Sequence, residues 1–156
     1  MYDDHVKVFI GADHRGFELK EHIKQWLLNQ KTIVVDCGNV RLDPEDDYPV
    51  YAQLVAEQVV MDEDARGIVI CGSGAGVVIA ANKVPGARCS DAMNLSDVHH
   101  ARAHDDLNIL ALASDFVSFA DAKQQVQIFL STPFETAERH VRRLRRIAQI
   151  ETKYNK

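Results

Sequence analysis

Short apolar runs alternate along the chain with longer segments whose apolar residues recur at helical spacing. The apolar runs predict buried strands, because continuous hydrophobic stretches are typical of a sheet covered on both faces; they span 6–12, 32–36, 67–71, 87–89 and 108–113. The other segments predict helices over 17–30, 48–61, 76–84, 95–103, 118–130 and 135–152. This alternation predicts an α/β fold with a five-stranded parallel sheet and helices on both faces.

The turn after the third predicted strand has the sequence Cys-Gly-Ser-Gly-Ala-Gly, from Cys71 to Gly76. Glycines let a ligand approach the backbone closely, and the start of the following helix offers N–H groups to an anion. A cysteine near such donors can have a lowered pKa and act as a base or a nucleophile. The loop therefore predicts chemistry beside an anion site, although a tight turn with a buried, inert cysteine is the alternative.

The same loop excludes two nucleotide-binding motifs. It lacks the Gly-Lys-Ser/Thr of a Walker A loop. The dinucleotide fingerprint needs Gly or Ala three residues after its second glycine, and those positions hold Val77 or Ile79, depending on which glycine begins the motif. The ligand is therefore not predicted to be bound by either of these nucleotide motifs.

Other polar residues are expected near this loop. Ligands of parallel sheets bind beyond the carboxyl ends of the strands, where Asp13 and His14 follow the first predicted strand. Arg139, Arg143 and Arg146 fall three and four residues apart on one face of the last predicted helix. Such a stripe is either a solvated helix face or, because guanidinium suits phosphate, an anion-binding surface.

Composition narrows the class of protein. A length of 156 residues is enough for one domain with a substantial core, so a single domain over 1–156 is expected. The net charge of −5 argues against nucleic-acid and membrane partners. An odd count of three cysteines argues for a reducing compartment. The segment Met1–His5 is not a signal peptide and no apolar run could span a bilayer, so a cytoplasmic protein is expected.

Several motifs together resemble the ribose-5-phosphate isomerase B family, which includes galactose-6-phosphate and allose-6-phosphate isomerases. In chain order they are Gly11–Phe17, Asp47–Pro49, Cys71–Gly76 followed by Ala80–Lys83, His104–Asn108 and Arg139–His140. The resemblance covers residues 6 to about 148.

This resemblance implies a Rossmann-like three-layer α/β/α sandwich and a homodimer or homotetramer. The active sites would be shared between subunits, with the C-terminal helix extending to a partner. It also implies aldose–ketose isomerisation of a sugar phosphate, with neither a metal nor an organic cofactor.

The resemblance assigns a catalytic role to three residues. The reaction passes through a cis-enediolate and needs a base, for which Cys71 is the candidate, because Val77 stands where part of the family has a glutamate. Ser73 would relay a proton between the sugar oxygens, and His104 would open the furanose ring.

The remaining roles concern substrate binding. The backbone of the loop would stabilise the enediolate through Gly72, Gly74, Ala75 and Gly76. The phosphate would be held by His14, Arg139 and Arg143. Asp13 and Tyr48 would contact the sugar, and Asp105 lies beside the ring-opening histidine. Taken singly, Asp13 could instead cap a turn, and Tyr48 could be a core aromatic.

Two positions depart from the family pattern. Asp105 stands where the family commonly has asparagine, and Asp115 where it often has a phosphate-binding arginine. A carboxylate cannot donate a hydrogen bond and repels an enediolate or a phosphate. We therefore predict an enzyme that has changed its substrate or that acts weakly on ribose 5-phosphate.

Two other functions remain open at this point. A non-catalytic sensor of a sugar phosphate or nucleotide on the same fold would account for both acidic replacements. A metal enzyme would use His100 and His104, four apart on a helix, with His99, Asp97, Asp105 and Asp106 nearby. The spacing fixes no third ligand, however, and no His-Glu-x-x-His motif is present.

Overall fold

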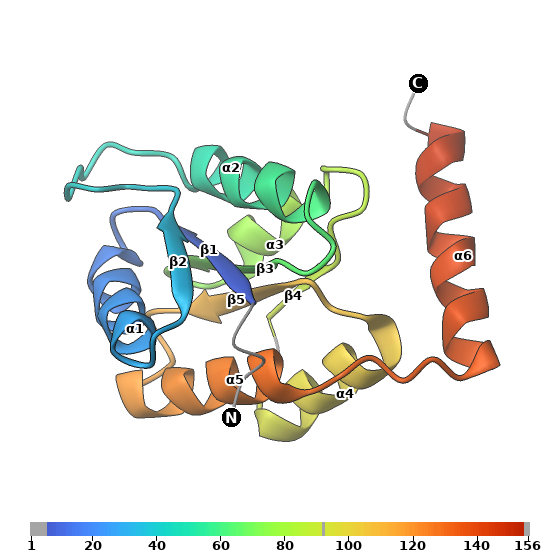
Figure 1. Ribbon diagram of the computed structural model, residues 1–156. Coiled ribbons are helices and arrows are strands. Elements are labelled where there is room, and N and C mark those ends of the chain that lie inside the picture. The colour runs from blue at the N-terminus through green and yellow to red at the C-terminus, as the bar shows by residue number, and fades with distance from the viewer. Residues whose placement is uncertain (1–5, 92, 155–156) are drawn as a thin grey trace.

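The protein is described by a computed structural model that covers residues 6–91 and 93–154; the Met1–His5 segment lies outside the described residues. Five strands form one parallel sheet in the order β2-β1-β3-β5-β4 (Figure 1). They are β1 (Lys7–Ala12), β2 (Ile33–Asp36), β3 (Arg66–Cys71), β4 (Cys89–Ser90) and β5 (Ile109–Ala113). The predicted five-stranded α/β fold is confirmed.

Helices cover both faces of this sheet and make three layers (Figure 1). One face carries α1 (Phe17–Asn29), α4 (Leu95–Asp105) and α5 (Phe119–Ser131). The other carries α2 (Tyr48–Val60) and α3 (Ala75–Ala81). The predicted Rossmann-like sandwich is therefore present in the described residues.

The strands are apolar throughout because each face of the sheet has its own core. Along β3, Ile68 and Ile70 pack into the core with α1, α4 and α5, whereas Val69 and Cys71 pack into the core with α2 and α3. The two-residue period of a strand produces this division. It also determines that the Cys71 side chain lies on the α2 and α3 side, at the carboxyl end of the central strand.

Some element boundaries differ from the sequence prediction, because particular backbone groups bind elsewhere. The fourth strand covers Cys89–Ser90 rather than 87–89, since the Arg88 N–H donates to the Asn108 side chain. The last helix, α6 (Glu138–Tyr154), begins three residues later than predicted. There, the Glu135 N–H donates to the Ala103 carbonyl at 2.8 Å and ties the chain to the end of α4.

Helix α6 stands beside the sandwich rather than within it (Figure 1). His140 is its one buried residue, while Ile147 and Ile150 are exposed. The Glu151 carboxylate accepts a hydrogen bond from the Gly86 N–H at 3.0 Å and attaches the far half of the helix. The extension of this helix to a partner subunit stays a prediction. Within 6–91 and 93–154, no helix combines the length and the apolar character needed to cross a membrane.

Candidate active site

The loops that follow β1, β3 and β5 meet at the carboxyl edge of the sheet and enclose a cavity of about 230 Å³. This is the position in which open parallel sheets bind ligands. The cavity brings together residues that are distant in sequence. They are Asp13, Arg15, Tyr48, Cys71, Gly72, Ser73, Gly76 and Asp115.

Cys71 ends β3 and opens into this cavity with 4% of its surface exposed. Its carbonyl oxygen accepts from the Ser114 N–H at 2.9 Å and from the Ser114 hydroxyl at 3.1 Å, which fixes the end of the strand. The other two thiols are poor candidates for a base. Burial raises the pKa of Cys37 to about 11 and the pKa of Cys89 still further. Among the described residues that line the cavity, Cys71 is the one thiol.

Two positions of the glycine loop would not readily accept a side chain. Gly74 has φ +79°, a conformation that side chains rarely adopt, just before α3 begins at Ala75. At Gly76, an added Cβ would lie 2.7 Å from the Tyr48 ring, so the ring packs directly on the glycine backbone. Ser73 is exposed at the cavity. The loop therefore presents backbone, a hydroxyl and a phenol to the same space.

Asp13 is buried and its side chain organises the turn after β1. Its Oδ1 atom accepts from the N–H groups of Arg15 and Gly16, both at 3.0 Å. The turn presses against β3, because a Cβ on Gly16 would lie 2.6 Å from the Ile70 carbonyl oxygen. The capping role considered for Asp13 is confirmed, and the residue also lines the cavity.

His14 is held by Asp46 from the loop before α2. The Asp46 Oδ1 atom accepts from the His14 N–H at 2.8 Å and lies 2.8 Å from its Nδ1 atom. The hydrogen bond to this carboxylate raises the pKa of His14. Burial alone would raise the pKa of Asp46, but its hydrogen bonds from His14 and Asn39 outweigh this and lower it. The interaction uses Nδ1 and leaves Nε2 for another partner.

A second group of predicted residues lies at the opposite edge of the sheet. His104 is at the end of α4, just before the start of β5, whereas Cys71 pairs with Ala113 at the end of β5. Asp105 and, on α6, Arg139 and Arg143 are exposed at this end. One chain therefore does not bring His104, Asp105, Arg139 or Arg143 into the cavity that Cys71 lines.

His104 has close aromatic and acidic neighbours. Its ring centroid is 4.6 Å from that of His140 and 5.0 Å from that of His100. Its Nε2 atom is 3.7 Å from Glu135 Oε2. Candidate ligand atoms of His104, Glu135 and His140 lie within 4.8 Å of one another, as do those of Asp13, His14 and Asp46. His104 therefore lies beside His140 and Glu135 as well as His100 of its own helix. The absence of a required metal stays a prediction.

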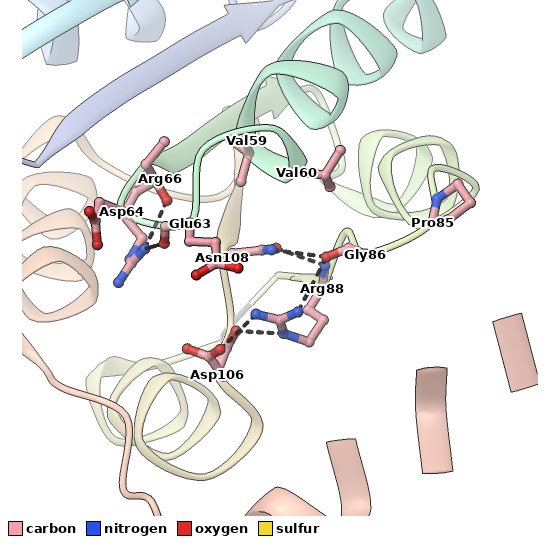
Figure 2. Close-up of a pocket in the computed structure, with 11 residues that line it drawn as sticks. Val59, Val60, Glu63, Asp64, Arg66, Pro85, Gly86, Arg88, Asp106 and Asn108 are labelled. Carbon is pink, nitrogen blue, oxygen red and sulfur yellow. Dashed lines mark hydrogen bonds and ion pairs between the residues drawn. The ribbon is translucent and has the colours of Figure 1, made fainter. Parts of the chain in front are cut away.

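A larger cavity of about 610 Å³ lies at the same amino edge (Figure 2). Four of its polar side chains, those of Arg66, Arg88, Asp106 and Asn108, bind one another or nearby backbone. The Arg88 guanidinium donates to the Asp106 carboxylate at 2.8 Å, and the Asn108 amide donates to the Gly86 carbonyl at 3.0 Å (Figure 2). These interactions connect the loops before β4 and β5, so Arg88, Asp106 and Asn108 have a structural role there.

Comparison with known proteins decides the family. The sequence model described as Ribose/Galactose Isomerase matches residues 8–147. The chain belongs to this family. Ribose-5-phosphate isomerase B of Mycobacterium tuberculosis (strain H37Rv) is 40% identical over 146 residues, which are 94% of this chain and 90% of that protein. The predicted family of aldose–ketose isomerases is therefore confirmed.

Solved structures of ribose/galactose isomerases support the same assignment. Ribose-5-phosphate isomerase B from Clostridium thermocellum is 41% identical, with a TM-score of 0.91 over 95% of this chain and 99% of that one. The enzyme from Mycoplasma genitalium, solved with bound ribulose-5-phosphate, is 40% identical, with a TM-score of 0.90 over 95% and 97%. The likeness extends over nearly the full length of each chain.

The two acidic departures from the family pattern have different surroundings. Asp105 is exposed at the end of α4. Asp115 lines the cavity and binds the Arg15 guanidinium at 2.5 Å. The sequence prediction assigned no role to Arg15 or Asp46, although Arg15 directly follows the predicted Asp13-His14 pair at a strand end. That position was the signal available for Arg15.

Proposed function

We propose that the chain interconverts an aldose and a ketose phosphate, either ribose 5-phosphate and ribulose 5-phosphate or a related pair, with Cys71 as the base. The observation that carries this proposal is the shared cavity of the Cys71 thiol and the Ser73 hydroxyl at the glycine loop. The bound ribulose-5-phosphate of the Mycoplasma genitalium enzyme supports the substrate class.

The residues of the cavity suit the steps of such a reaction. The Cys71 thiolate removes a proton from the carbon beside the carbonyl, and the electron pair moves to the carbonyl oxygen to give the cis-enediolate. Backbone N–H groups from Gly72 to Gly76 stabilise that oxyanion. The Ser73 hydroxyl carries a proton between the two oxygens, and Cys71 returns its proton to the neighbouring carbon. Asp13 and Tyr48 contact the sugar hydroxyls.

The second group of residues supplies ring opening and phosphate binding from another subunit. His104 protonates the ring oxygen, and Arg139 and Arg143 hold the phosphate together with His14 of the Cys71 edge. The separation of His104 from the Cys71 cavity within one chain favours a homodimer or homotetramer with shared sites. Asp105 beside the ring-opening histidine and Asp115 in the cavity favour a substrate other than ribose 5-phosphate, or weak action on it.

A deuterium-exchange assay tests the reaction. Purified protein is incubated in deuterated water with tetrose, pentose and hexose phosphates, and NMR follows isomerisation and deuterium at the carbon beside the carbonyl. We expect one sugar to be converted, with Cys71→Ala reducing turnover at least about 100-fold because it removes the acid–base group. Cys37→Ala removes a thiol outside the cavity and is the matched control.

Two outcomes would contradict the proposal. Turnover that survives in Cys71→Ala would exclude this thiol as the base. An absence of exchange with every sugar, in folded protein that still binds phosphate esters, would instead support the sensor function.

A further inference from the structure

An ion pair lies directly over the first glycine of the loop, Gly72. The Arg15 guanidinium, through Nη2, donates to Asp115 Oδ2 at 2.5 Å. A Cβ on Gly72 would lie 2.5 Å from Arg15 Nε and 2.9 Å from Asp115 Oδ2. Both side chains therefore pack against the backbone of Gly72, the residue that follows Cys71.

The backbone fixes the position of this pair. Asp13 Oδ1 accepts from the Arg15 N–H at 3.0 Å, and the Ser114 hydroxyl donates to the Arg15 carbonyl at 2.9 Å. The Asp115 N–H donates to the Gly72 carbonyl at 3.0 Å. The loops after β1, β3 and β5 are thus bonded to one another at the point where the pair forms.

The pair supplies two of the three charged side chains among the residues that line the cavity, the third being Asp13. Among the described residues that line the cavity, Arg15 carries the one positive charge, and Asp13 and Asp115 carry negative charges. The hydrogen bond from Arg15 to Asp115 is the main cause of a raised Arg15 pKa, and the nearby Cys71 contributes in the same direction. The Arg15 side chain is 57% exposed, so its remaining N–H groups are accessible to a ligand.

We propose that Arg15 binds an anionic oxygen of the substrate in the Cys71 cavity, and that Asp115 positions its guanidinium. This inference rests on the proposed isomerase function. The anionic oxygen belongs either to the phosphate or to the enediolate, and both suit a planar, permanently charged guanidinium. Asp115 then orients a cation at the loop and offsets its charge while the cavity is free.

Three variants test the pair: Arg15→Met, Asp115→Asn and the double variant. Arg15→Met leaves the Asp115 carboxylate unpaired beside the base, so kcat/KM should fall about 100-fold. Asp115→Asn removes the negative charge that Arg15→Met leaves unpaired. The double variant should therefore have a kcat/KM about ten-fold higher than that of Arg15→Met, as expected for coupled neighbours. Arg15→Lys keeps the charge without the planar fork and should retain more activity than Arg15→Met. Lys123→Met, which removes a half-buried cation of α5 outside the cavity, is the control for net charge.

The kinetic constants distinguish the two oxygens. If Arg15 binds the phosphate, Arg15→Met raises KM and weakens competitive inhibition by inorganic phosphate. If it binds the enediolate, kcat falls while inhibition by phosphate is unchanged. Arg15→Met with wild-type kcat, KM and phosphate inhibition would overturn the proposal, because the pair would then be only a surface ion pair.

Alkylation of Cys71 by iodoacetamide separates this inference from the isomerase function, since it requires no turnover. A positive neighbour stabilises a thiolate, so Arg15→Met should slow the reaction and Asp115→Asn should accelerate it. In a protein without isomerase activity, this pattern together with protection by inorganic phosphate in wild type but not in Arg15→Met would retain Arg15 as an anion-binding residue. Equal alkylation rates and equal protection in such a protein would overturn both proposals.

Discussion

His14 shows how one hydrogen bond controls the charge of a single residue at the candidate site. The Asp46 carboxylate raises the pKa of His14, so the imidazolium persists above the usual pKa of about 6.5. The pair contributes folding stability that is fully present below that usual value and is lost as the pH rises through the raised value. A positive His14 is also the form that suits phosphate.

Asp46→Asn should move substrate binding to lower pH. Without the carboxylate, the pKa of His14 falls toward its ordinary value, so the pH above which KM rises should decrease. The measurement is KM for the converted sugar phosphate as a function of pH. Glu45→Gln, an exposed acid in the same loop, is the control. An identical alkaline limb in Asp46→Asn and wild type would show that His14 does not bind the phosphate as a cation.

Residues at strand ends were predictable from the sequence, whereas their long-range partners were not. Asp13 and Cys71 directly follow or end predicted strands, and the rule for parallel sheets brings such positions together. Asp46 reaches His14 across 32 residues and Asp115 reaches Arg15 across 100. No local pattern encodes such pairings, because they depend on how the loops meet in space.

At the scale of elements, buried charges connect α1 to β2. The Lys20 side chain is fully buried, and its ammonium donates to Asp36 at 2.8 Å and to Glu21 at 2.5 Å. Lys24 binds the same two carboxylates. Burial alone would raise the pKa of Asp36, but hydrogen bonds from the two lysines outweigh it and lower that pKa. The resulting stability is present above the ordinary carboxyl pKa and is lost as the pH falls through the lowered value.

Asp36→Asn should destabilise the fold by about 3 kcal/mol, because it leaves the buried Lys20 with one of its two carboxylates. Glu21→Gln removes a more exposed carboxylate and should cost about 1 kcal/mol or less. Urea unfolding of both variants at neutral pH measures the difference. A urea midpoint of Asp36→Asn equal to that of the wild type would show that the buried lysine does not depend on Asp36.

Element type was predictable throughout, but element ends followed tertiary contacts. The start of α6 moved to Glu138 because the chain before it bonds to α4. The fourth strand shortened because Arg88 binds the Asn108 side chain. Periodicity reports which residues are buried, and it carries no information about such single bonds.

At the scale of the molecule, the two groups of candidate residues lie at opposite edges of one sheet. Cys71 and its loop lie at the carboxyl edge, and His104 with the arginines of α6 lies at the amino edge. In a closed dimer, two complete sites would form, each with Cys71 from one chain and His104 from the other.

Mixing two inactive variants should therefore restore activity. Cys71→Ala and His104→Ala chains, unfolded and refolded together in equal amounts, should reach about one quarter of wild-type turnover, because half of the dimers are mixed and each has one intact site. Refolding Cys71→Ala with the double variant Cys71→Ala/His104→Ala gives no intact site and is the control. A mixture no more active than its components would indicate that each chain forms its site alone.

In the proposed dimer, the placement of the two groups at opposite edges would have a genetic consequence. A chain that lacks both Cys71 and His104 would leave an unaltered partner without any complete site, even though every residue of that partner is intact. Each normal copy paired in this way would contribute no activity. Such an allele would act as a dominant negative, and overproducing the defective chain would be a means of silencing the native one.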